Sequence, residues 1–317
     1  MFGESAIDAN GSAIGFNGSA IDANGIAIDT NESAIETTID TIAFNKLVHS
    51  EGRRLYRALP WREVDDAYLV LCSEVMLQQT QVSRVLKYWQ RWVSAFPTVD
   101  ALASASVADV LELWQGLGYN RRALALKKSA EICSEQNAGT IPQTLEGLLA
   151  LPGVGQATAA GVCVFAYKQV QVYLETNIRT VFIHHFFENQ DKVHDREIMK
   201  LVKASCDVDD PRGWYYALLD YGNYLKSILP NPSRRSSHYT RQSTFKGSIR
   251  QKRAFLLREA LRTPLISTDM MLESLNLFEK RAGLDTAQRK DVQGILSALA
   301  SEGFLVACGE DCWSIAK

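Results

Sequence analysis

The sequence lacks any long hydrophobic run, and this absence is the first feature that narrows the class of protein. Hydrophobic residues make up 46% of the 317 positions, yet no apolar stretch reaches the roughly 18 residues that a membrane-spanning helix needs. The first residues also lack the basic segment followed by an apolar segment that marks a secretory signal. We therefore expect a soluble protein with a substantial buried core, organised as two domains plus additional sequence.

Cysteine is also scarce and scattered. The six cysteines occur in otherwise ordinary globular sequence, at Cys72, Cys133, Cys163, Cys206, Cys308 and Cys312. This distribution does not resemble a disulfide framework, which favours a reduced, intracellular setting. Cys308 and Cys312 flank one short segment, but two cysteines without further ligands are a weak indication of a metal site.

Basic residues are absent from the first 40 positions, which contain seven acidic residues. The formal net charge of -2 therefore conceals an asymmetry, because the remainder of the chain carries a net charge of +5. Residues 226–262 contain ten Lys or Arg and a single acidic residue, Glu259. A concentrated basic stretch is typical of a phosphate-binding surface, and a solvated linker is the alternative that charge alone leaves open.

Residues 5–39 consist of five seven-residue units, SAIDANG, SAIGFNG, SAIDANG, IAIDTNE and SAIETTI. A coiled coil needs apolar residues at the a and d positions of a heptad, whereas here the apolar Ala-Ile pair is adjacent and Gly and Asn recur. We interpret residues 1–41 as a low-complexity tail and expect it to be disordered.

From Phe44 to Phe245, apolar residues recur at three- and four-residue spacing, which predicts helices. Pro and Gly interrupt this pattern at FPT, GLGY, GTIP, LPGVG and DDPRG, where we expect turns. We therefore predict an all-α region of two lobes at residues 42–225, followed by a basic loop at residues 226–246.

After the basic loop, the composition changes. Residues 247–317 contain three further helix candidates, and FLVACGEDCWSIA follows as two short β-like runs about a Gly-Glu-Asp turn. Three helices closed by a hairpin predict a small winged-helix-like α+β domain. Such modules bind duplex DNA in some proteins and protein partners in others, so the pattern alone does not decide the role of this domain.

The segment LPGVG at Leu151–Gly155 lies between two helical segments. Its two glycines allow a tight turn that leaves main-chain N–H groups exposed at the start of the next helix, where the helix dipole favours an anion. Such a hairpin can hold a DNA phosphate without reading sequence, and an ordinary turn between helices is the alternative. Glu175 follows 20 residues after Gly155, in VYLETNIRTV, at the predicted start of another helix.

Two further motifs are SEVMLQQTQV at Ser73–Val82 and GLGY at Gly116–Tyr119. Together with LPGVGQATA, and in this order, they resemble the MutY-type adenine DNA glycosylases of the helix-hairpin-helix superfamily over residues 48–245. The resemblance implies an all-α, two-lobed glycosylase core that excises a mispaired base, adenine opposite 8-oxoguanine or guanine, in base-excision repair. It also implies a monomer that binds double-stranded DNA containing a mispair or lesion and does not bind membranes. If the source is prokaryotic, we expect a cytoplasmic protein associated with the nucleoid.

The resemblance assigns a role to each matching residue. Glu74 matches the acid that protonates adenine, Glu175 takes the place of an Asp that stabilises the developing sugar cation, and Asn177 matches a positioning residue. The matching DNA contacts are Gln78, Gln79, Tyr119, Leu151, Gly153, Val154, Gly155, Gln156 and Thr158. Breaking a purine N-glycosidic bond requires an acid and an anion, which two carboxylates in different environments can provide. We expect Glu175 to be ionised at a helix N-terminus and Glu74 to be protonated in a desolvated pocket.

Three features depart from the pattern of the superfamily. Ala157 stands where bifunctional members carry the Lys that attacks the sugar, so we expect no AP-lyase activity. Many members bind an iron–sulfur cluster through four cysteines, and here these four positions are Lys226, Ser233, Ser236 and Gln242. We therefore expect neither that cluster nor another cofactor. A monovalent cation at the hairpin is left open. We expect the basic loop to contact DNA through its charge instead.

Glu175 is the third departure, because the family has Asp there and the extra methylene moves the carboxylate. A misplacement of about 1 Å within a site can cost ~10²-fold in rate. The C-terminal residues also do not resemble the Nudix-like domain with which the family checks for 8-oxoguanine. Two alternatives therefore stay open: a glycosylase for another base, such as uracil, thymine or hypoxanthine, and a non-catalytic protein that binds DNA lesions.

Overall fold

The computed structural model describes residues 20–21, 27–28 and 41–317, and the chain divides into two compact units, residues 1–44 and 45–317. In the first unit, two-residue strands β1 (Ala20–Ile21) and β2 (Ala27–Ile28) pair antiparallel. The rest of the heptapeptide repeat lies outside the described residues. The predicted disorder of this tail therefore stays a prediction, as do the predicted domain boundaries.

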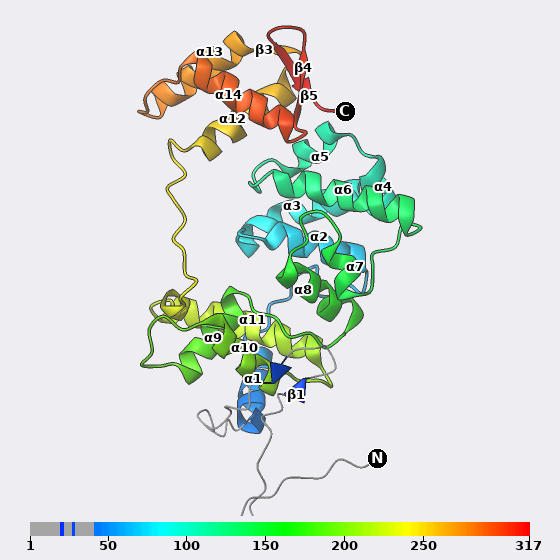
Figure 1. Ribbon diagram of the computed structural model, residues 1–317, viewed down its shortest axis with the longest axis vertical. Helices are drawn as coiled ribbons and strands as arrows, with labels where there is room; N and C mark the ends of the chain where they lie inside the picture. Colours follow the sequence, from blue (N-terminus) through cyan, green and yellow to red (C-terminus); the bar gives the residue numbers. More distant parts are fainter. Residues whose placement is uncertain (1–19, 22–26, 29–40) are drawn as a thin grey trace, which may run out of the picture. The chain divides into compact units, whose positions relative to one another are not determined.

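Helices make up the regular structure between residues 41 and 228, which confirms the predicted all-α region (Figure 1). The first lobe is formed by α2 (Ala67–Leu77), α3 (Val82–Ala95), α4 (Val99–Ser104), α5 (Val107–Trp114), α6 (Arg121–Gln136), α7 (Leu145–Leu149) and α8 (Gln156–Tyr167). The second lobe is formed by α9 (Thr176–Phe186), α10 (Asp195–Ser205), α11 (Pro211–Ile228) and the 3-10 helix η1 (Pro232–Arg235). Helix α1 (Thr41–Leu55) packs on α11 from Asn45 onward, where Trp214 Nε1 donates to Asn45 Oδ1 at 2.9 Å.

The first lobe is organised around α8, in which every residue from Thr158 to Phe165 is buried. A helix that is apolar on all sides belongs in a core, and α2 is the main helix that packs against this one. Asp66 starts α2 as its N-cap, because its side chain accepts hydrogen bonds from the N–H groups of Tyr68 at 2.8 Å and Leu69 at 3.1 Å. The α2–α8 pair therefore places SEVMLQQ beside the helix that follows LPGVG.

A buried ion pair connects the segment before α2 with α11. The Arg62 guanidinium donates to the two carboxylate oxygens of Asp220 at 2.7 and 2.9 Å, and the two side chains are 2% and 1% exposed. Bidentate pairs of this kind fix orientation as well as charge. Asp220 also pairs with Arg57, whose Nε donates to its Oδ1 at 2.5 Å. Removing Asp220 would leave the buried Arg62 guanidinium without its counter-charge, which makes this contact a rigid connection within the described part of the core.

The C-terminal residues form a three-helix domain with a small sheet, as predicted. Its helices are α12 (Ile249–Arg262), α13 (Thr268–Arg281) and α14 (Arg289–Ser301). Strands β4 (Leu305–Cys308) and β5 (Cys312–Ile315) form the predicted hairpin, and β3 (Ile266–Ser267) adds to its other edge to give the antiparallel order β3-β5-β4. The sequence pattern did not predict β3, because two residues are too few to show a period of two.

No helix in the described ranges combines the length and apolar character that crossing a lipid bilayer would require.

Candidate active site

The LPGVG hairpin turns at Gly153, whose backbone φ of +74° is in the left-handed region that favours glycine. A Cβ atom at this position would also lie 2.6 Å from the Cβ of Ala125, so both conformation and space select glycine. Helix α8 begins immediately after Gly155, an N-cap that has no side chain to accept from the first N–H groups. N–H groups at a helix start that lack a side-chain cap, next to the exposed Gln156, have the geometry that an anion-binding site would need.

Three of the residues predicted to contact DNA at the hairpin have buried side chains. Leu151 is 4% exposed, Val154 is 7% exposed and Thr158 is 7% exposed. Their apolar surface is used to anchor the hairpin on the first lobe, so a phosphate can meet only the backbone there. A contact with DNA at these residues would therefore be made by the main chain, as the sequence analysis expects of the hairpin, and it stays a prediction. Gly155 and Gln156 are exposed.

The two neighbouring glutamines predicted to enter the DNA have different positions. Gln78 ends α2, and its Nε2 donates to Thr158 Oγ1 at 2.9 Å and to the Gly153 carbonyl at 3.4 Å. Gln79 is exposed and has a left-handed backbone with φ of +52°. Gln78 therefore ties α2 to the hairpin, and Gln79 is the one whose side chain is directed outward.

Arg122 organises this region, although the sequence pattern did not single it out. Its guanidinium donates to the carbonyls of Val75 at 2.8 Å, Met76 at 3.0 Å and Gln78 at 2.6 Å, and to that of Gly118 at 3.0 Å. Three of these carbonyls lie at the C-terminal end of α2, and the fourth belongs to the GLGY turn, so Arg122 joins the two segments. Burial lowers the pKa of Arg122 to about 10. Only tertiary structure distinguishes this arginine from its exposed neighbour in sequence.

Tyr119, the predicted intercalating residue, is 38% exposed and has a left-handed backbone with φ of +49°. Its hydroxyl accepts a hydrogen bond from Arg250 Nη1 of α12 at 3.0 Å. A non-glycine residue in this conformation is uncommon and is held there by its surroundings. The ring is therefore presented at the surface, with its hydroxyl in contact with the C-terminal domain.

Glu74 lies on α2 against α8 at Gly161. A Cβ atom on Gly161 would lie 2.6 Å from Glu74 Oε2, so the carboxyl group occupies the space that a larger residue would fill. Part of the side chain reaches solvent, yet burial is the largest influence on it and, with the negative charge of Glu175, raises its pKa to about 8. Arg62 opposes this shift. Glu74 is therefore mostly protonated at neutral pH, as its predicted role as an acid requires.

Glu175 is the N-cap of α9. Its Oε1 accepts hydrogen bonds from the N–H groups of Asn177 at 2.6 Å and Ile178 at 3.1 Å, and its Oε2 accepts from Asn177 Nδ2 at 3.4 Å. These bonds favour the ionised form as predicted, but burial outweighs them and raises the pKa of Glu175 above its ordinary value. The interpretation of Glu175 as a helix cap is therefore confirmed, and its role as a site carboxylate stays a prediction.

Asn177 lies next to the Glu175 carboxylate. Its Nδ2 faces Glu175, while its Oδ1 is buried and, within the described residues, has no hydrogen-bond partner. A buried acceptor without a donor is rare and needs an explanation. A hydroxyl or N–H group of a bound substrate would satisfy it, in accordance with its predicted positioning role.

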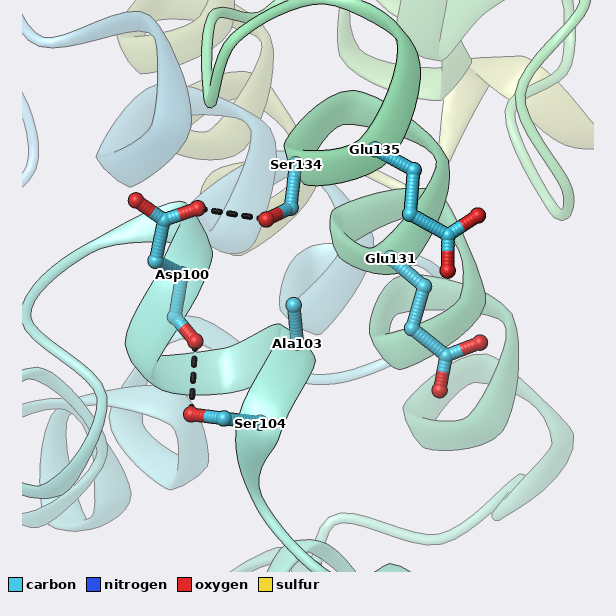
Figure 2. Close-up of a pocket in the computed structure, with 6 residues that line it drawn as sticks. All are labelled: Asp100, Ala103, Ser104, Glu131, Ser134 and Glu135. Atoms are coloured by element: carbon cyan, nitrogen blue, oxygen red, sulfur yellow. Dashed lines mark hydrogen bonds between the residues drawn. The ribbon is translucent and has the colours of Figure 1, made fainter.

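A surface cavity of about 370 Å³ lies elsewhere, between α4 and α6. Figure 2 shows its lining, which consists of Asp100, Ala103, Ser104, Glu131, Ser134 and Glu135. None of the predicted site residues lines it. Its carboxylates would repel phosphate, so the acidic cavity is separate from the candidate site in both position and charge.

The residues at the cluster positions do not fit an iron–sulfur cluster. Ser233 and Ser236 are buried, and both take part in local hydrogen bonds: Ser233 Oγ donates to Asn231 Oδ1 at 2.8 Å, and the N–H of His238 donates to Ser236 Oγ at 3.1 Å. Cluster iron is held by Cys thiolates, and none of the four positions has a cysteine. Within the described ranges, no group of three or more His, Cys, Asp or Glu side chains is placed to hold a metal ion.

Protein contacts hold this segment in place. Arg235 donates to the carbonyls of Phe187 and of Glu188, the latter at 2.5 Å, and to that of Ile183 at 3.2 Å. These are carbonyls at the C-terminal end of α9, where a cation is favoured by the helix dipole. Val193 and Ser236 form a bridge beside it. The segment is thus fastened to α9 by an arginine.

Residues 72–206 match the family model of the HhH-GPD superfamily base excision DNA repair proteins. The match includes both carboxylates, the hairpin and the GLGY turn, in the arrangement described above. This part of the chain is therefore similar to the proteins of that superfamily.

Within the superfamily, the resemblance to the MutY type is confirmed. The chain is 45% identical over 130 residues to an adenine DNA glycosylase of Mycobacterium tuberculosis (strain ATCC 25618 / H37Rv), which is 41% of this chain and 43% of that protein. It is 31% identical over 185 residues to that of Buchnera aphidicola subsp. Baizongia pistaciae (58% and 52%) and 41% identical over 148 residues to that of Rattus norvegicus (44% and 29%). The chain thus matches about half, or less, of the length of these relatives.

Solved structures show the same fold. A thermostable thymine-DNA glycosylase aligns with a TM-score of 0.53 at 22% identity, covering 57% of this chain and 85% of that one. Endonuclease III in a non-covalent DNA complex aligns with a TM-score of 0.50 at 16% identity, covering 58% and 86%. These likenesses confirm the two-lobed helix-hairpin-helix fold.

Proposed function

We propose that this protein is a monofunctional DNA glycosylase that extrudes and excises a mispaired base, most simply adenine opposite guanine or 8-oxoguanine. The observation that carries the proposal is the pair Glu74 and Glu175, which come from different lobes and act on each other electrostatically, the charge of Glu175 raising the pKa of Glu74. The similarity to adenine DNA glycosylases supports adenine as the base.

Glu74 acts as the general acid. With a pKa of about 8, it carries a proton at neutral pH and can donate it to a ring nitrogen of the departing purine. The protonated base is a better leaving group because it departs without negative charge. A carboxylate with an ordinary pKa would be ionised at this pH and could not serve in this way.

Glu175 supplies the anion. As the N–glycosidic bond breaks, positive charge develops on the sugar, and a carboxylate fixed in place stabilises that charge without reorganising. Three hydrogen bonds from the start of α9 hold Glu175 in one orientation. The unpartnered Asn177 Oδ1 lies beside it as an acceptor for the nucleotide or for the attacking water.

DNA binding in this proposal uses three surfaces. The N–H groups at the start of α8 hold a phosphate, and the exposed Gln79 and Tyr119 fill the space that the extruded base leaves. The basic loop presents Arg234, Arg241 and Lys246, which are all exposed, to the phosphate backbone. In this proposal the chain works as a monomer. It forms no Schiff base, because Ala157 has no amine, and it uses no iron–sulfur cluster, because the four cluster positions hold no cysteine.

The test uses duplexes with A opposite 8-oxoguanine, A opposite G, U opposite G and T opposite G, followed by alkali to cleave abasic sites. We expect scission at the A-containing duplexes only after alkali. Scission at U or T alone would transfer the activity to another base. Scission without alkali, or trapping by borohydride, would contradict the absence of lyase chemistry.

One observation favours a second candidate, a protein that binds lesions without cleaving them. The Glu175 carboxylate is already engaged by the first N–H groups of α9, as in a plain helix cap. If all four duplexes stay intact while the protein binds a mismatch more tightly than a matched duplex, the binding function replaces the enzymatic one.

A further inference from the structure

Lys226 occupies the last turn of α11, at a position where cluster-binding members of the superfamily have a cysteine. It is half-buried, although a lysine has a strong preference for solvent. The cluster assignment does not explain it, and the proposed mechanism does not use it. Its surroundings therefore need an account of their own.

Helices α9 and α11 pack against each other (Figure 1). Their backbones come close together at Gly222. A Cβ atom at Gly222 would lie 2.2 Å from the carbonyl oxygen of Asn177, so the two backbones touch there. Glu175 caps α9 two residues before this contact. The crossing thus brings α11 next to the site.

Lys226 follows Gly222 by one helical turn, and residues at i and i+4 lie on the same face of a helix. Long helical side chains lean toward the N-terminus of their helix, over the preceding turn. In α11, that turn is Gly222, which has no side chain of its own. The Lys226 side chain is therefore directed back toward the start of α9, where the Glu175 carboxylate lies.

The charges of the two groups respond to each other. The Lys226 ammonium lowers the pKa of Glu175, and the Glu175 carboxylate raises the pKa of Lys226, in each case against the larger effect of burial. The other titratable groups that act on this pair or on its neighbour Glu74 are Glu74 itself, Tyr173, Arg57, Arg62 and Tyr216. Arg57 acts on Lys226 and Arg62 on Glu74, whereas Lys226 is the cation whose charge acts on Glu175 itself.

We propose that Lys226 is a positioning residue whose ammonium is the counter-charge of Glu175 and thereby keeps the single proton of the carboxylate pair on Glu74. This role rests on the proposed function. Two carboxyl groups that share one proton can exchange their roles, and a fixed cation beside one of them decides which is the acid and which is the anion. A cysteine at this position serves a cluster, whereas here the lysine serves the active site.

The first experiment measures single-turnover excision against pH with the full chain. In Lys226→Met, ionised Glu175 loses its counter-charge, so we expect the acidic side of the rate profile to move upward by about one pH unit, a loss of ~10-fold at the acidic end. Lys226→Arg should restore the profile. Lys203→Met, an exposed lysine of α10 in the same lobe, is the matched control and should show the unchanged profile. A uniform loss at every pH, or no change, would overturn the proposal.

The second experiment does not depend on catalysis and so separates this inference from the proposed function. Thermal unfolding is followed against pH for the wild type, Lys226→Met, Glu175→Gln and the double variant. The destabilisation caused by Lys226→Met should grow as the pH rises and Glu175 ionises, because an ionised buried group then lacks its partner. In the Glu175→Gln background, this growth should disappear. A destabilisation that is equal in both backgrounds would refute the coupling even if the enzyme is active.

Discussion

The local environments of the Glu74 and Glu175 carboxyl groups differ in their hydrogen-bond donors and charges, and not only in their burial. Glu74 fits against the bare backbone of Gly161, and its pKa is raised to about 8. Glu175 is also half-buried, but three hydrogen bonds and the charge of Lys226 oppose the effect of burial on its pKa. Two carboxyl groups with the same chemistry are thus prepared for opposite roles by the presence or absence of donors around them.

Removing the acid should have the largest effect. In Glu74→Gln, no proton can be delivered to the base, and we expect a loss of roughly 10²–10⁴-fold in the single-turnover rate with little change in DNA affinity. Glu112→Gln, at an exposed position of α5, is the matched control. A Glu74→Gln enzyme with wild-type rate would mean that the base leaves without protonation by this residue.

Removing the anion should cost somewhat less and separate activity from stability. Glu175→Gln cannot stabilise a sugar cation, and we expect a loss on the order of 10²-fold in rate. Because burial raises the pKa of Glu175, its ionised form is unfavourable to folding, so the same variant should unfold at a higher temperature than the wild type at alkaline pH. Loss of both activity and stability would indicate that the residue is only a helix cap.

Filling the space beside the Glu74 carboxyl group should reduce the excision rate by a smaller factor. Gly161→Ala introduces a Cβ atom into the space of the carboxyl group, and a displacement of about 1 Å should cost up to ~10²-fold in rate. Gly294→Ala is the control, because it lies within α14 with nothing within 4 Å and should be stabilised by roughly 0.5–1 kcal/mol. Equal activity of both variants would show that Glu74 does not depend on this space.

The smallest effect concerns the pH dependence of stability. The pKa of Glu74 is raised from its ordinary value of 4.5 to about 8 in the folded protein. At a pH between these two values, the folded protein therefore holds a proton that the unfolded chain releases. Its contribution to stability is complete below the lower value and is lost as the pH rises through the upper one. The difference in melting temperature between wild type and Glu74→Gln should therefore change across this window. A constant difference would mean that the folded carboxyl group has an ordinary pKa.

Much of the fold and site could be predicted from local pattern. Helical periodicity and Gly or Pro punctuation located the helices because these signals depend on neighbours in the chain. The hairpin was recognisable because left-handed turns select glycine, as at Gly153. In contrast, the burial of Leu151, Val154 and Thr158 depends on what packs against them, and their sequence gave no sign of it.

Long-range contacts account for what was missed. Arg122 and Arg235 both cap helix ends that lie far from them in the sequence, and an arginine that reaches a distant carbonyl looks in sequence like any surface arginine. Gly161 likewise carries no local signal, since its selection depends on Glu74 in another helix.

The sequence by itself determined which groups are present: two glutamates, a glycine hairpin, an alanine where an amine nucleophile would stand and no cysteines at the cluster positions. The tertiary structure decided what these groups can do. Protonation depends on the dielectric surroundings, donors and charges that distant elements bring together. The proposed assignment of Glu74 as acid and Glu175 as anion therefore rests on the packing of α2 on α8 and of α9 on α11.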